Sequence, residues 1–86
     1  KIEIINIYFF IMLIVIVYSE QFTDNAKSLS DAVKQRWSDA SVNLMGTFGK
    51  SESFSRYQVQ IDRDVIYHSD SVTDNNSIIN LIEERL

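Results

Sequence analysis

The chain has 86 residues, enough for one small domain near the size at which a single hydrophobic core becomes marginal. Its formal net charge is −4 and its acidic and basic residues are interspersed, so no basic patch exists and nucleic-acid binding is not expected. The sequence contains no cysteine and no proline, which excludes disulfides, zinc–thiolate sites, thiol catalysis and cis-proline turns. With only two glycines, it also lacks a glycine-rich phosphate-binding loop.

An apolar run from Ile7 to Tyr18 ends abruptly at Ser19–Phe22, and it has more than one interpretation. Lys1 precedes it, and Val17–Ser19 offers residues that suit a signal peptidase, so the run resembles a secretory signal cleaved near Ser19. As a membrane helix, residues 4–18 would rise only ~22 Å, which is short of the ~30 Å hydrocarbon core.

The second half of the same run favours a different structure. Residues 12–18 are dense in β-branched side chains, which is typical of a central parallel strand buried on both faces. If the run is a strand, the protein is expected in the cytoplasm. If it is a signal or an anchor, the secretory pathway or a membrane is expected. Residues 1–11 then form an apolar extension, or part of a signal segment, through which membrane contact is possible.

Downstream of the run, hydrophobic periodicity predicts a helix that Thr23 or Asp24 would cap. Its apolar stripe consists of Ala26, Leu29, Val33 and Trp37. A strand is expected over residues 40–45, and residues 56–62 alternate as a second strand with Tyr57, Val59 and Ile61 facing inward.

The rest of the chain predicts a hairpin and a final helix. A tight turn at residues 62–64 joins the alternating strand to a strand at residues 65–67. The last helix would be capped by Thr73 or Asp74, with an apolar stripe of Ile78, Ile79, Ile82 and Leu86. If the end of the apolar run is a strand, the order is β-α-β-β-β-α, an α/β (α+β) fold with a four-stranded mixed sheet and two helices.

These residues and their order resemble the selenoprotein W/T/H (Rdx) family of small thioredoxin-like proteins. Val15–Tyr18 resembles the family's first strand, and Arg36–Ala40 resembles the end of its first helix with the proline and glycine replaced. Tyr57–Val59 resembles the family's Phe-Glu-Val strand, and Val65–Ser69 its following segment, one residue out of step. The resemblance implies a thioredoxin-like domain over residues 12–86 and a family role in cell redox homeostasis.

The resemblance places the family's redox pair, Cys-x-x-Cys or Cys-x-x-Sec, at Ser19 and Phe22. A serine hydroxyl without a neighbouring base cannot replace a thiolate, and phenylalanine has no redox chemistry. We therefore expect a redox-inactive member that has no cofactor and no metal and acts by protein binding. The candidate partner-binding residues are Gln21 and Phe22 in this turn. The alternative is a small secreted or membrane-anchored protein of unknown role.

Enzymatic function ranks third. His68 is the single histidine, and a Ser-His-Asp set with Ser51 or Ser53 is conceivable, but no nucleophile-elbow sequence accompanies it. The acidic residues Asp62, Asp64, Asp70 and Asp74 lack EF-hand spacing. A solvated rim of the hairpin is the favoured interpretation of this group.

Overall fold

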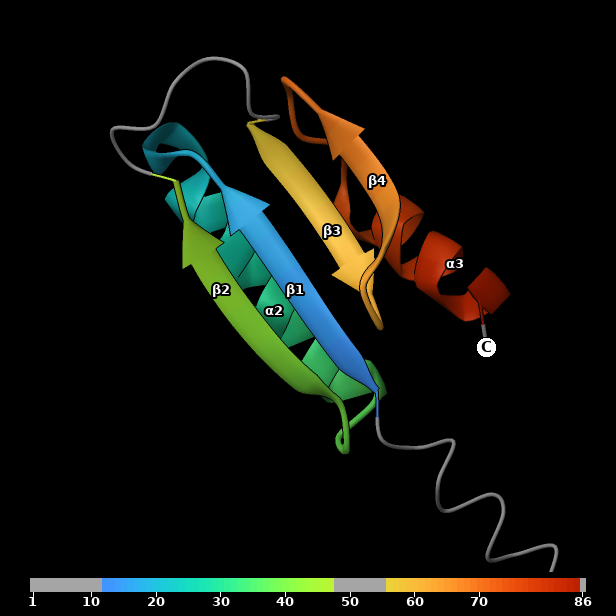
Figure 1. Cartoon of the computed structure of the whole chain (residues 1–86). Coiled ribbons are helices and arrows are strands. Elements are labelled where there is room, and N and C mark those ends of the chain that lie inside the picture. Colours follow the sequence, from blue (N-terminus) through green and yellow to red (C-terminus); the bar gives the residue numbers. More distant parts are fainter. Residues whose placement is uncertain (1–11, 48–55, 86) are drawn as a thin grey trace, which may run out of the picture.

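The computed structural model describes residues 12–47 and 56–85. Within these residues the chain forms four strands, two α-helices and one short 3-10 helix, η1 (Figure 1). In chain order they are β1 (Leu13–Tyr18), η1 (Glu20–Phe22), α2 (Thr23–Arg36), β2 (Ser41–Gly46), β3 (Tyr57–Ile61), β4 (Asp64–Ser69) and α3 (Asn75–Arg85).

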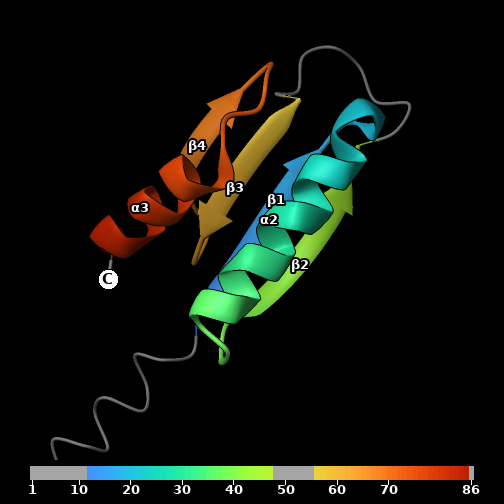
Figure 2. The same ribbon diagram turned by 180° about the vertical axis from the view of Figure 1, so that it is seen from behind.

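The strands form one mixed sheet in the order β2-β1-β3-β4. β1 is parallel to β2, and the β1–β3 and β3–β4 pairs are antiparallel. Figures 1 and 2 show that α2 and α3 both cover the same face of the sheet, and no helix of residues 12–47 and 56–85 lies on the other face. The predicted β-α-β-β-β-α order, with a four-stranded mixed sheet and two helices in an α+β fold, is confirmed.

β1 is the central strand, so the second half of the apolar run is part of the fold. Ile14 and Ile16 are completely buried, but Leu13 is exposed on the other face of the sheet, so the expected burial of this strand on both faces is wrong. The core lies between the sheet and the two helices, and it includes every inward residue expected on β3 (Tyr57, Val59 and Ile61). The helices contribute Ala26, Leu29, Val33, Ile78 and Ile82. A chain that began at Glu20 would lack this central strand.

The start of α2 differs from the expectation. Neither Thr23 nor Asp24 caps it, because η1 runs directly into the helix and Phe22 occupies the N-cap position without a side-chain hydrogen bond. The Thr23 hydroxyl instead donates to the carbonyl of Glu20 at 2.7 Å. Sequence reasoning missed η1, a turn too short to have a periodicity of its own.

The β3–β4 turn is tighter than predicted. Asp62 and Arg63 have φ values of 48° and 79°, the left-handed backbone of a two-residue type I′ turn, so β4 begins at Asp64. Asp62 also secures β1: its amide donates to the carbonyl of Leu13 at 2.9 Å, and its carboxylate accepts from the Leu13 amide at 3.3 Å. The carboxylate at this position is therefore part of the sheet.

At the start of α3 the predicted cap is present at Asp74. Its carboxylate accepts hydrogen bonds from the Ser77 amide at 3.1 Å and the Ser77 hydroxyl at 2.9 Å. The hydrogen bonds from Ser77 hold the pKa of Asp74 below its usual value, because they favour the ionised form. This cap is fully formed at neutral pH and weakens as acid protonates the carboxylate.

Several expectations fall outside the described residues. They concern residues 1–11 as an extension or signal, the serines Ser51 and Ser53, and Leu86 in the last helical stripe. In the described ranges, none of the helices combines the length and the hydropathy that a membrane span requires.

The central position of β1 makes its buried face the most sensitive part of the fold. We predict that Ile16→Ala lowers the free energy of unfolding by about 2–5 kcal/mol, because it opens a cavity beneath the sheet. Leu13→Ala is the matched control on the same strand, and it should cost less than about 1 kcal/mol because Leu13 is already exposed. Urea denaturation measures both values, and equal losses would contradict a central β1.

Candidate functional site

The candidate site is the turn between β1 and α2, where the resemblance places a redox pair. It follows the carboxyl end of the central strand, and the backbone fixes it at both ends. The Ser19 amide donates to the carbonyl of Arg56 at 2.9 Å, and the Phe22 amide donates to the carbonyl of Ser19 at 2.9 Å. The turn is therefore an ordered extension of the sheet into the helix.

Ser19 has a buried hydroxyl that lacks a hydrogen-bond partner in the described part of the chain. A serine becomes a nucleophile only when a base accepts its proton, and the Ser19 hydroxyl has no such contact. An unsatisfied buried hydroxyl costs about 1–3 kcal/mol. This position therefore shows neither redox chemistry nor an activated serine.

Phe22 packs partly into the domain. It is half-buried, and its ring meets that of Tyr57 edge to face, with centroids 6.0 Å apart and an interplanar angle of 74°. Tyr57 meets Tyr67 in the same way at 6.2 Å. Phe22, Tyr57 and Tyr67 form an aromatic cluster that supports the turn, and Gln21 stays exposed on its surface.

Within the aromatic cluster, Tyr57 has a raised pKa. Burial, with a smaller contribution from the neighbouring Tyr67, raises the pKa of the Tyr57 phenol to about 12. Its hydroxyl points to the carbonyl of Asn25 in α2 at 3.4 Å. The phenol therefore stays neutral at physiological pH and links β3 to α2.

His68 lies on β4, exposed and opposite Gln58 of β3. The two serines considered as nucleophiles for a triad with His68, Ser51 and Ser53, are outside the described residues. No hydrogen bond between His68 and an aspartate occurs within residues 12–47 and 56–85, so this part of the structure does not assemble a triad.

The acidic residues of the hairpin region are dispersed among separate contacts. Asp62 binds the amide of Leu13, Asp64 forms an ion pair with Arg85, and Asp74 caps α3. Asp70 is exposed. Residues 12–47 and 56–85 contain no group of three or more histidine, cysteine or acidic side chains arranged to hold a metal ion.

Sequence reasoning did not find the aromatic cluster or the buried hydroxyl of Ser19. The alternation of β3 placed Tyr57 inward, which was a usable signal for one member. Contact with Phe22 depends on how η1 turns, and Tyr67 reaches the cluster across an irregular ladder with a bulge between Val59 and Gln60. Neither feature leaves a periodic pattern in the sequence.

The unsatisfied hydroxyl gives a direct test of this geometry. We predict that Ser19→Ala leaves the free energy of unfolding unchanged or raises it by up to about 2 kcal/mol, because it removes a buried polar atom that has no partner. Thr23→Val is the matched control in the same turn: it removes a formed hydrogen bond and should cost about 0.5–1.5 kcal/mol. A clear loss of stability in Ser19→Ala would show that the hydroxyl is bonded.

Neither a family model nor a curated protein matches this sequence. The fold by itself does not determine a function, since one architecture supports many unrelated activities. The functional argument therefore depends on the residues of the β1–α2 turn.

Proposed function

We propose that the protein is a degenerate Rdx-type, selenoprotein W-like domain that has lost its thiol pair and acts by binding another protein. The proposal rests on the identity of the residues in the β1–α2 turn. Ser19 and Phe22 stand where the resemblance expects redox residues, and Phe22 is packed against Tyr57. Without a thiol, the turn keeps its position at the end of the central strand and loses its electron-transfer chemistry.

The turn has the properties of a preformed contact surface. Glu20 and Gln21 are exposed, and Phe22 is half-buried beside them. The contact of Phe22 with Tyr57 and the backbone hydrogen bonds of Ser19 hold the backbone of the turn in place before a partner arrives. A rigid surface binds at a lower entropic cost than a loop that must first become ordered.

The alternative proposal is a secreted or membrane-anchored protein cleaved near Ser19. Such cleavage would remove β1, and with it Ile14 and Ile16 from the core. The remaining strands would lose the strand that joins β2 to β3. Cleavage near Ser19 would therefore destabilise the domain, which supports an uncleaved chain, and N-terminal sequencing of the expressed protein tests this point.

The binding proposal predicts a partner contact at the turn. A photo-crosslinking amino acid at Gln21 should trap a discrete protein in cells, and the same probe at Asp39 should not. Asp39 is the matched control because it is also exposed and lies beyond the other end of α2. The readout is crosslinked mass on a denaturing gel, and equal crosslinking from both positions would contradict a specific surface at the turn.

The resemblance also predicts a gain of function. The natural chain should not catalyse disulfide reduction in an insulin assay driven by dithiothreitol, whereas Ser19→Cys/Phe22→Cys should gain activity. A thiolate at this helix start is stabilised by the backbone dipoles, so the new pair can reduce a substrate disulfide while it is itself oxidised.

Ser19→Cys alone is the control, because one thiol cannot close an internal disulfide. A folded double variant without activity would contradict the correspondence with the family's redox turn. Activity of the unmodified chain would contradict the redox-inactive assignment.

A further inference from the structure

Among the described residues, β2 is an edge strand whose outer hydrogen-bonding edge is unpaired. The Ser41 amide donates to the carbonyl of Met12, and the Thr47 amide donates to the carbonyl of Tyr18, both at 2.8 Å. Since successive residues of a strand turn their backbone groups to opposite sides, the amides and carbonyls of Val42, Leu44 and Gly46 point away from β1.

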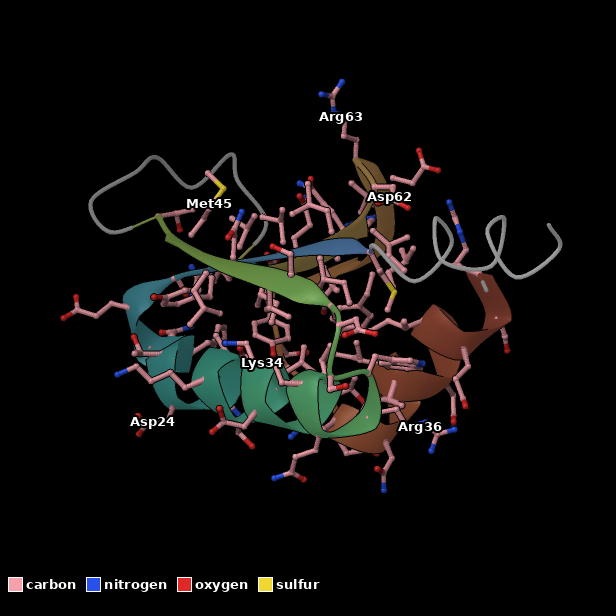
Figure 3. All side chains as sticks on the ribbon, turned by 90° about the horizontal axis from the view of Figure 1, so that it is seen from below. Asp24, Lys34, Arg36, Met45, Asp62 and Arg63 are labelled. Carbon is pink, nitrogen blue, oxygen red and sulfur yellow. The ribbon has the colours of Figure 1, made fainter. Side chains whose placement is uncertain are left out.

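The edge also carries exposed apolar side chains. Leu44 is 37% exposed and Met45 is 55% exposed, and Figure 3 shows Met45 on the side of the sheet opposite α2. No charged residue and no proline occurs in Ser41–Gly46. Natural proteins use charges, prolines and bulges to keep edge strands from pairing with other chains, and β2 has none of these devices.

The opposite edge of the sheet is protected. β4 starts with Asp64, which is paired with Arg85, and its ladder with β3 contains a bulge where Ile66 is the additional residue. The two edges of one sheet therefore differ in their capacity to add a strand.

We propose that two copies of this chain associate through β2, antiparallel to each other, with a two-fold axis at Leu44. In this register Leu44 faces Leu44 of the second copy, and Val42 faces Gly46 of the second copy. All the outward backbone groups of β2 are then paired, and both sheets join into one. The proposal rests on the edge geometry of β2 and on the charges of α2, and it is independent of the function proposed for the β1–α2 turn.

The charges on α2 support the proposal that a second copy of the chain pairs with the edge of β2. One side of α2 faces α3 and β3, because Arg36 is paired with Glu83 and the carbonyl of Asn25 accepts from Tyr57. At helical spacing, Lys27, Asp31 and Lys34 fall on the other side, toward the free edge of β2. Figure 3 shows Lys34 on this side, beneath β2.

Two hydrogen bonds show which residues of α2 lie beside which residues of β2 along the strand direction. Tyr57 and Gly46 both pair with Tyr18, so the Tyr57–Asn25 contact places residue 25 near the end of β2. The Ala40 amide donates to the carbonyl of Trp37, which places residue 37 near the start of β2. The helix rises about 18 Å between residues 25 and 37, close to the about 20 Å that the strand spans from residue 40 to 46. Leu44 is thus level with roughly residue 29 of α2.

A two-fold axis at that level makes the charges complementary. Lys27 and Asp31 lie symmetrically above and below residue 29, so each Lys27 faces Asp31 of the second copy. Figure 2 shows α2 over β1 and β2, and paired edges would bring the two α2 helices to about 10 Å, a normal packing distance. An axis at Asn43 would move the centre toward residue 31 and bring the two Asp31 side chains together, which disfavours that register.

Sedimentation of the full chain tests the association. The unmodified protein should sediment as a dimer at tens of micromolar, and Leu44→Lys should raise the dimer dissociation constant at least tenfold, because it places two like charges at the axis. Val65→Lys is the matched control: Val65 is 46% exposed on the protected edge, and its substitution should leave the dimer intact. A monomeric unmodified chain, or equal effects of the two lysines, would overturn the proposal.

A charge exchange on α2 tests the register without altering the strand. Lys27→Glu and Asp31→Lys should each weaken the dimer severalfold, because each creates a like-charged pair across the axis. The double variant Lys27→Glu/Asp31→Lys restores opposite charges and should recover the original dissociation constant. Additive weakening in the double variant would overturn the Leu44-centred register, and circular dichroism verifies that each variant is folded.

Discussion

The burial of β1 is the constraint on which the remainder of the structure depends. Ile14 and Ile16 are completely covered, and the strand is bonded on both sides, to β2 in parallel and to β3 in antiparallel orientation. A parallel neighbour requires a crossover, and α2 supplies it on the helical face of the sheet. An antiparallel neighbour allows the chain to continue as a hairpin, and α3 then covers the core beneath β3 and β4 (Figure 2).

The same strand determines the chemistry of the candidate site. Because β1 ends at Tyr18 within the sheet, the next residues must turn directly into α2, and Ser19 is held at the sheet by Arg56. In a thioredoxin-like protein this turn would expose thiols. Here it carries a hydroxyl without a partner among the described residues and an aromatic ring packed on Tyr57, so Phe22 stabilises the turn by packing.

Polar residues that suggest chemistry in the sequence have structural roles in the fold. Asp62, Asp64 and Asp74 look like an acidic cluster when read along the chain, yet they bind a strand amide, a helix-terminal arginine and a helix start. Each of these carboxylates lies at the start or end of a strand or helix. The two edges of the sheet also differ in their polar residues. β4 carries an acidic residue and a bulge, whereas β2 has neither.

The sequence by itself determined the order of elements after the apolar run and most core positions of β3 and the two helices, because burial imposes a period of two on strands and about 3.6 on helices. It left the apolar run open between a strand and a signal segment, because a continuous apolar stretch has no period that separates the two. It did not determine the start of α2, where periodicity predicted a Thr23 or Asp24 cap and η1 intervenes. It placed Tyr57 inward but gave no indication of its contacts with Phe22 and Tyr67. Only the tertiary structure decided which partners each buried group meets and which sheet edge stays open. Those outcomes depend on contacts between residues far apart in the chain, whereas periodicity records only whether a position is buried.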